Sequence, residues 1–220
     1  MITSLSAVLP EDGVVVFDLD DTLYPEMEFV RSGFRAVARY IGELCTIDVL
    51  GTLNELFDAG QQHVFDRLIL GHRLPLLKSQ LIEIYREHQP ELSLAREASQ
   101  LLSSLRAAGH SIGLMTDGRS TTQRNKIRAL GLEALVDAIL ISEEFGSAKP
   151  AQRNYKCFER RFPRRRYAYV GNDPAKDFVT ANRLGWKSIC VLDPGDHIHP
   201  QLFDRVSVEA HPQYVMERLA

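Results

Sequence analysis

The sequence has few cysteines, and their arrangement argues against a protein stabilised by disulfides or by structural zinc. Its 220 residues contain three cysteines, Cys45, Cys157 and Cys190, which are widely spaced and form no C-x-x-C pair. Such a set favours neither a disulfide framework nor a structural zinc site. We therefore expect a protein of the reducing cytoplasm.

Long apolar runs and an excess of basic residues are missing as well. No segment approaches the roughly 18 consecutive apolar residues of a transmembrane helix, and the N-terminus lacks the basic start and apolar run of a signal peptide. The 26 Lys and Arg residues stand against 29 Asp and Glu residues, for a formal net charge of -3. This balance gives no general reason to bind nucleic acid or an anionic membrane. We expect a monomer or homodimer without nucleic-acid or membrane partners.

From Gly109 onward, short apolar runs alternate with helix-length segments, which is typical of βαβ units and a mostly parallel sheet. The runs that we expect to form buried strands are residues 14–17, 112–115, 138–141, 167–170 and 188–192. The sequence therefore predicts an α/β fold. Its core is a Rossmann-like parallel sheet of about five strands in a three-layer α/β/α arrangement.

One long stretch interrupts this alternation with helices. Apolar residues recur there at spacings of three and four, which predicts an amphipathic helix. These residues are Val30, Phe34, Val37, Ile41 and Leu44. Two or three further helices are expected to follow. We predict an α/β core domain formed by residues 1–23 and 96–220, and an inserted helical cap subdomain formed by residues 24–95.

The strongest signal for chemistry is the segment VVVFDLDDTL, in which Asp18, Asp20, Asp21 and Thr22 follow a buried strand without interruption. Carboxylates crowded at the end of a buried strand repel one another unless a proton or a cation lies between them. Capping a helix would need one such residue rather than three. The motif therefore predicts a divalent metal site at this strand end.

This motif resembles the first motif of the haloacid dehalogenase superfamily, an apolar strand followed by D-x-D-x-T. The other family motifs follow in order. A second strand ends in Thr116, Lys149 precedes Pro150, and the strand at 167–170 leads into further acidic residues. The helical insert between the first and second motifs is similar to the family's C1-type cap. The resemblance places the chain in the phosphatase branch of the superfamily.

The resemblance implies a role for each motif residue. Asp18 would be the nucleophile that forms an aspartyl-phosphate, and Asp20 would act as general acid and then general base. Lys149 would place a positive charge between the nucleophile and the phosphate. The residues implied in phosphate binding are Thr116, Asp117, Gly118 and Lys149.

The implied cofactor is Mg²⁺, because the acidic cluster offers oxygen ligands and no His or Cys accompanies it. The implied ligand set is Asp18, the backbone carbonyl of Asp20, Asn172, Asp173 and Asp177. One position departs from the family pattern, because Asn172 stands where the family commonly has Asp. Either Asp173 is the inner ligand with Asp177 as its partner, or Asn172 ligates through its amide. We favour Asp173, since a carboxylate suits Mg²⁺ better.

The expected activity is Mg²⁺-dependent hydrolysis of a small phosphomonoester, either a sugar phosphate, a sugar acid phosphate or a nucleotide. A cap of this kind closes over the active site and selects the substrate. Candidate substrate-binding residues at its start are Tyr24, Glu28 and Arg31. Two alternatives stay open. A phosphosugar mutase would use the same residues, because the sequence does not show whether water or a sugar hydroxyl attacks the aspartyl-phosphate. A non-catalytic binding module could keep the fold.

A second polar group follows the last predicted strand. It comprises Asp193, Asp196, His197 and His199. Pro194-Gly195 and Pro200 interrupt this segment, so we interpret it as a surface loop rather than a metal site.

Overall fold

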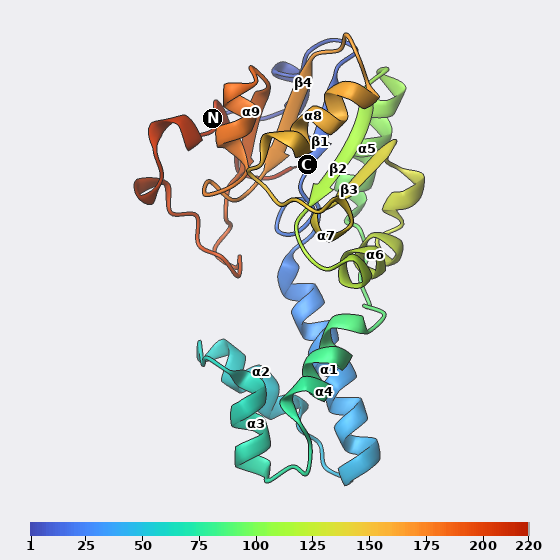
Figure 1. Cartoon of the computed structure of the whole chain (residues 1–220), viewed down its shortest axis with the longest axis vertical. Coiled ribbons are helices and arrows are strands. Elements are labelled where there is room, and N and C mark those ends of the chain that lie inside the picture. Colours follow the sequence, from blue (N-terminus) through green and yellow to red (C-terminus); the bar gives the residue numbers. More distant parts are fainter. Residues whose placement is uncertain (220) are drawn as a thin grey trace.

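The computed structural model describes residues 1–219 and contains one parallel sheet of six strands in the order β3-β2-β1-β4-β5-β6 (Figure 1). The strands are β1 (Val14–Phe17), β2 (Ser111–Thr116), β3 (Ala138–Ile141), β4 (Tyr167–Gly171), β5 (Lys187–Val191) and β6 (Tyr214–Met216). All neighbouring pairs are parallel. The predicted α/β fold with a parallel sheet is confirmed. The short edge strand β6 is additional, since its three residues are too few to stand out as an apolar run.

Strand β1 lies at the centre of the sheet, paired with β2 on one side and β4 on the other. All four of its residues are fully buried. A strand covered on both faces requires an unbroken apolar run rather than an alternating pattern, and Val14–Phe17 is such a run. The most buried strand thus leads directly into the acidic motif.

Helices cover both faces of the sheet and produce three layers. They are α5 (Arg96–Ala107), α6 (Ser120–Ala129), α7 (Ser142–Phe145), α8 (Gln152–Arg161) and α9 (Phe178–Arg183), with 3-10 helices at Leu5–Ala7, Leu132–Ala134, Phe203–Arg205 and Val208–Ala210. Val15 and Phe17 of β1 belong to an apolar cluster with residues of α5 and α6. Val14 and Val16 belong to a second cluster with residues of α8 and α9. Alternate side chains of one strand therefore supply the two cores.

Four further helices form a separate group beside the sheet domain, here called the helical bundle (Figure 1). They are α1 (Glu26–Cys45), α2 (Leu50–Asp58), α3 (Val64–His72) and α4 (Lys78–Glu87). The bundle has its own core, built on Val30, Phe34, Val37 and Ile41 of α1. Within residues 1–219, no helix combines the length and the apolar character needed to cross a membrane.

The helical bundle begins directly at the acidic motif. The Asp21 carboxylate accepts a hydrogen bond from the backbone N–H of Glu26 at 2.8 Å. It thereby satisfies one of the free N–H groups at the start of α1. Because the carboxyl ends of parallel strands share one edge of a sheet, the segments after β1, β2 and β4 meet at the same place.

Candidate active site

A cavity of about 180 Å³ lies at this edge of the sheet, where the segments after β1, β2 and β4 meet. The residues that line it are Asp18, Asp20, Asp21, Glu26, Thr116, Asp117, Gln123, Asn172, Asp173, Lys176 and His199. Six of these residues were candidate site residues from the sequence, and they come from three separate motifs. The fold therefore brings the ends of these motifs to one cavity.

Lys149 lies directly beside the expected nucleophile. Its Nζ is 2.8 Å from Asp18 Oδ1 and 2.8 Å from Asp177 Oδ1, and its side chain is fully buried. Burial lowers the pKa of Lys149, but the Asp177 and Asp18 carboxylates outweigh that effect and raise the pKa above its ordinary value. The side chain is therefore an ammonium ion fixed beside Asp18.

Asp18 is nearly inaccessible to water, with 4% of its surface exposed. Burial raises the pKa of Asp18 to about 7, although the nearby Lys149 ammonium acts in the opposite direction. A buried carboxylate with so high a pKa gains most from a cation in the adjoining cavity, since a cation favours its ionised form.

Asp177 occupies a different place from the one that the sequence suggested. It is completely buried, and its Oδ1 atom contacts Lys149 Nζ at 2.8 Å and accepts a hydrogen bond from the Tyr169 hydroxyl at 3.1 Å. Its Oδ2 atom accepts hydrogen bonds from the backbone N–H groups of Asn172 and Asp173 at 3.1 and 2.8 Å. Both oxygens are thus engaged within the protein. Asp177 holds Lys149 and the loop after β4 instead of facing the cavity as a free metal ligand.

The remaining expected ligands fit a hard divalent cation. Asp18, Asn172 and Asp173 line the same cavity and offer carboxylate and amide oxygens. Mg²⁺ prefers oxygen ligands and is commonly held by one or two carboxylates. Lys176 lies beside this group, with Nζ 3.4 Å from Asp173 Oδ2. The donor set is therefore compatible with Mg²⁺.

The expected phosphate-binding segment follows β2. Thr116, the last residue of that strand, is 1% exposed and lines the cavity together with Asp117. Asp117 Oδ1 accepts a hydrogen bond from the backbone N–H of Lys149 at 3.1 Å, which joins two of the motifs. Gly118 adopts a φ of +144°, and a Cβ atom there would lie 2.7 Å from the amide nitrogen of Gln123. This position therefore requires glycine.

Asp20 is held by three side chains. Its Oδ1 atom accepts hydrogen bonds from the Tyr24 hydroxyl at 2.5 Å and from Lys126 Nζ at 2.7 Å, and its Oδ2 atom accepts one from Gln123 Nε2 at 3.2 Å. Burial raises the pKa of Asp20, but the Lys126 charge and these hydrogen bonds outweigh it, so the pKa is lowered. Asp20 is thus a fixed carboxylate at the wall of the cavity.

The three candidate substrate residues have different surroundings. Tyr24 is buried, and its hydroxyl donates to Asp20. Glu28 is exposed on α1, while Arg31 donates to Asn54 Oδ1 at 2.7 Å and pairs with the exposed Asp58, both residues of α2. None of the three is among the described residues that line the cavity. Their roles in substrate binding stay predictions.

Several residues near the cavity were not among the candidates from the sequence. They are Glu26, Gln123, Lys126, Lys176 and His199. For Gln123 and Lys126 a signal existed, because both closely follow the second motif and their spacing of three places them on one face of α6. Lys176 stands between Asp173 and Asp177 in the fourth motif, whereas Glu26 and His199 lie outside all four motifs.

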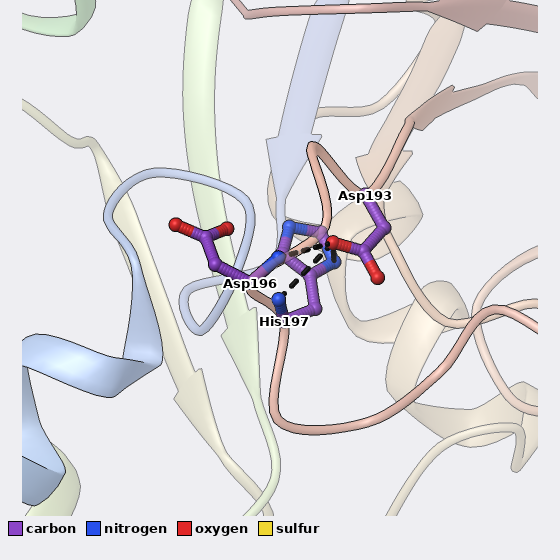
Figure 2. Close-up of side chains that lie close together, drawn as sticks. All are labelled: Asp193, Asp196 and His197. Atoms are coloured by element: carbon purple, nitrogen blue, oxygen red, sulfur yellow. Dashed lines mark hydrogen bonds and ion pairs between the residues drawn. The ribbon is translucent and has the colours of Figure 1, made fainter. Parts of the chain in front are cut away.

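The group after β5 is arranged as a turn (Figure 2). Asp193 Oδ1 accepts hydrogen bonds from the backbone N–H groups of Gly195, Asp196 and His197 at 2.7, 3.0 and 3.1 Å. One potential ligand atom from each of Asp193, Asp196 and His197 lies within 4.8 Å of the others, but no bond joins the Asp193 and Asp196 carboxylates in Figure 2. Asp193 therefore acts here as a turn-forming side chain, which agrees with the loop interpretation of this segment.

Comparisons with known proteins show the family of the chain. The family model for haloacid dehalogenase-like hydrolase matches residues 15–191. The chain is 33% identical over 193 residues to the glyceraldehyde 3-phosphate phosphatase of Methanocaldococcus jannaschii, with 81% of this chain and 84% of that protein covered. It is 26% identical over 228 residues to the ribulose-1,5-bisphosphate 5-phosphatase of Halopiger xanaduensis, with 93% and 95% covered.

Solved structures show the same fold. A HAD-hydrolase from Bacillus subtilis bound to magnesium, YfnB, superposes with a TM-score of 0.64 at 20% identity, covering 94% of this chain and 95% of that one. CbbY from Rhodobacter sphaeroides in complex with phosphate gives 0.56 at 18% identity, covering 94% and 95%. The resemblance inferred from the sequence is confirmed: the chain is an enzyme of the haloacid dehalogenase-like hydrolase family, in its phosphatase branch.

Proposed function

We propose that the protein is a Mg²⁺-dependent phosphoric monoester hydrolase that acts on small phosphorylated metabolites through an aspartyl-phosphate. The observation that carries the proposal is the contact of Lys149 with Asp18 at 2.8 Å, at a cavity lined by the other motif residues. The phosphatase activities of the two curated relatives support it.

In the proposed mechanism, a carboxylate oxygen of Asp18 attacks phosphorus in line with the leaving oxygen. The Lys149 ammonium lessens the repulsion between this carboxylate and the phosphate, and Thr116 donates a hydrogen bond to a phosphoryl oxygen. Asp20 protonates the leaving oxygen and then removes a proton from the water that splits the aspartyl-phosphate. Thus two carboxylates at the end of one strand would carry out different tasks.

The cofactor would be held by Asp18, Asp173, the backbone carbonyl of Asp20 and Asn172. When bound, Mg²⁺ would neutralise negative charge on the phosphoryl group and orient it. Asp177 leaves the proposed ligand set, because its two oxygens bind Lys149, Tyr169 and the backbone after β4. We assign it instead to fixing Lys149 beside Asp18.

The cavity limits the size of the substrate. Its volume of about 180 Å³ is below the roughly 300–1,000 Å³ of typical small-molecule pockets. Phosphate and a few further heavy atoms fit such a space, which favours three- to five-carbon phosphates, the class on which the two curated relatives act. We propose that the helical bundle serves as the cap over this cavity. The three free cysteines suit a cytoplasmic setting.

The test is phosphate release from a substrate panel with Mg²⁺ and with a chelator. The panel contains glyceraldehyde 3-phosphate, ribulose 1,5-bisphosphate, a hexose phosphate, a nucleotide and p-nitrophenyl phosphate. We expect metal-dependent release with the highest kcat/KM for the smallest sugar phosphates. Folded protein that releases nothing from any substrate would contradict the proposal and favour a binding module. Transfer of phosphate to a sugar hydroxyl instead of water would favour a mutase.

A further inference from the structure

The two oxygens of the Asp20 carboxylate have different surroundings. Oδ1 accepts hydrogen bonds from the Tyr24 hydroxyl at 2.5 Å and the Lys126 ammonium at 2.7 Å. The contact of Oδ2 with Gln123 Nε2 is longer, at 3.2 Å. An ammonium group can only donate hydrogen bonds, so a proton on Oδ1 would face a donor that cannot accept it. The proton that Asp20 transfers therefore belongs on Oδ2.

Lys126 is buried in a way that stability alone does not explain. Its side chain is 3% exposed, its Nζ lies 4.2 Å from the centroid of the Phe29 ring, and Glu26 Oε1 is 3.8 Å away. Burying an ammonium carries a desolvation penalty that an ion pair and an aromatic face offset only in part. Replacement of a buried ion pair by apolar residues is often neutral for stability. The charge at Lys126 thus points to a role at Asp20.

Helix α6 is arranged to deliver two side chains to this carboxylate. Gln123 and Lys126 are three residues apart, so they lie on the same face of α6. Gly118 leaves space for Gln123, because a Cβ atom there would lie 2.7 Å from Gln123 Nε2. The helix that begins after the phosphate-binding segment therefore also fixes the orientation of Asp20.

We propose that Lys126 is a positioning residue: together with Tyr24 it holds Oδ1 of Asp20 and directs Oδ2 toward the leaving oxygen and, afterwards, toward the attacking water. This inference rests on the proposed function, which gives Asp20 both proton transfers. First, the proton on Oδ2 passes to the leaving oxygen as its bond to phosphorus breaks. Then Oδ2 takes a proton from water as the water oxygen bonds to phosphorus and the Asp18 carboxylate is released.

The leaving group provides the test. A sugar alkoxide needs a proton in order to leave, whereas p-nitrophenolate leaves as a stable anion. For Lys126→Met we expect kcat/KM for the best sugar phosphate to fall about 10²-fold, with less than about a threefold change for p-nitrophenyl phosphate. For p-nitrophenyl phosphate, kcat should fall, because water attack on the aspartyl-phosphate still needs Asp20 as base. KM should fall by a similar factor, so that kcat/KM changes little. A burst of p-nitrophenol in the first turnover should then appear.

Three further variants distinguish the loss of a positioning role from a general loss of folded protein. Tyr24→Phe removes one hydroxyl and should show the same split between substrates. Lys126→Arg keeps the charge and should restore part of the sugar phosphate activity. Arg128→Met removes an exposed charge from the same helix and should match the wild type. An equal loss on both substrates, or no loss in Lys126→Met and Tyr24→Phe, would overturn the inference. Inactive wild-type enzyme would instead overturn the proposed function.

Discussion

At Asp18 the fold places a carboxylate where little water reaches it. As the proposed nucleophile, the side chain would have to be ionised to attack phosphorus, yet burial raises its pKa to about 7. Lys149 offsets this penalty from one side. Asp18 also lines the cavity in which we propose a cation binds, so the proposed nucleophile activation and metal binding would be coupled at a single residue.

Asp18→Asn should abolish turnover without unfolding the protein. An amide is a poor nucleophile, so we expect a loss of about 10³-fold or more in kcat. The pKa in the fold, about 7, exceeds the ordinary value of 3.8. The ionised carboxylate therefore destabilises the metal-free fold increasingly as pH rises between these values. Asn carries no charge, so the Tm of the variant should approach that of the wild type near pH 4 and exceed it at pH 8.

Steady-state kinetics and thermal melts in chelator provide these measurements. Activity within tenfold of the wild type would remove Asp18 as the nucleophile. A variant Tm below that of the wild type at pH 8 would show that the Lys149 contact outweighs the burial penalty.

Substitutions at Asn172 and Asp173 would show which of the two is the inner ligand of the proposed metal. Both line the cavity. We expect Asp173→Asn to weaken Mg²⁺ binding by about tenfold or more, since it removes a carboxylate ligand. Asn172→Asp should strengthen Mg²⁺ binding, because it adds a negative charge beside the site, and should lower the Tm of the metal-free protein through repulsion. Calorimetric titration with Mg²⁺ measures both effects. If Asp173→Asn binds Mg²⁺ like the wild type, Asn172 is the inner ligand.

At the scale of elements, the sequence was informative wherever a strand end fixes a side chain. Asp18 follows one buried apolar run and Thr116 ends another. Parallel strands bring such strand ends together at one edge of the sheet. The placement of Asp177 was not predictable in this way. Its spacing of four from Asp173 suggested a shared metal face, but the loop after β4 turns its carboxylate inward to Lys149 and Tyr169. That direction depends on packing, which spacing does not describe.

The same limit applies to the bundle and to β6. Helical spacing located an amphipathic helix where α1 forms, because four apolar residues face one core. The spacing could not show that Arg31 pairs with Asp58 of α2. Strand β6 depends on pairing with β5 across the sheet edge, a tertiary contact with no local pattern of its own.

Helix packing within the bundle can be tested at two glycines of α1. A Cβ atom at Gly33 would lie 2.4 Å from the Tyr85 ring of α4, whereas one at Gly42 would meet its nearest atom at 3.6 Å. We expect Gly33→Ala to lower the free energy of unfolding by about 1–3 kcal/mol, since overpacking displaces the ring. Gly42→Ala should be neutral or raise it by about 0.5–1 kcal/mol, because Ala favours helix. Denaturant unfolding measures both; equal stabilities would contradict the packing argument.

For the whole molecule, helix α6 connects the bundle to the site. One set of its side chains reaches Asp20, and another reaches the end of α4. Thr122 Oγ1 donates to the Arg86 carbonyl at 2.9 Å, and Asn125 Nδ2 donates to the carbonyls of Glu87 and His88 at 3.1 Å each. A movement of the bundle would therefore act on the same helix that contacts Asp20, the proposed general acid and base.

Removing these contacts should loosen the bundle without touching the motif residues. Hydrogen bonds of this kind contribute about 1 kcal/mol each, so the double variant Thr122→Val, Asn125→Ala should favour open arrangements by about tenfold or more. We expect a larger radius of gyration by small-angle scattering and a lower kcat/KM for the best sugar phosphate. Activity on p-nitrophenyl phosphate should change less, because a rigid aryl ester with a good leaving group depends less on an enclosed site and on Asp20. Ser103→Ala, which removes an exposed hydroxyl of α5, is the matched control. An unchanged radius together with unchanged kinetics would mean that α6 does not hold the bundle over the cavity.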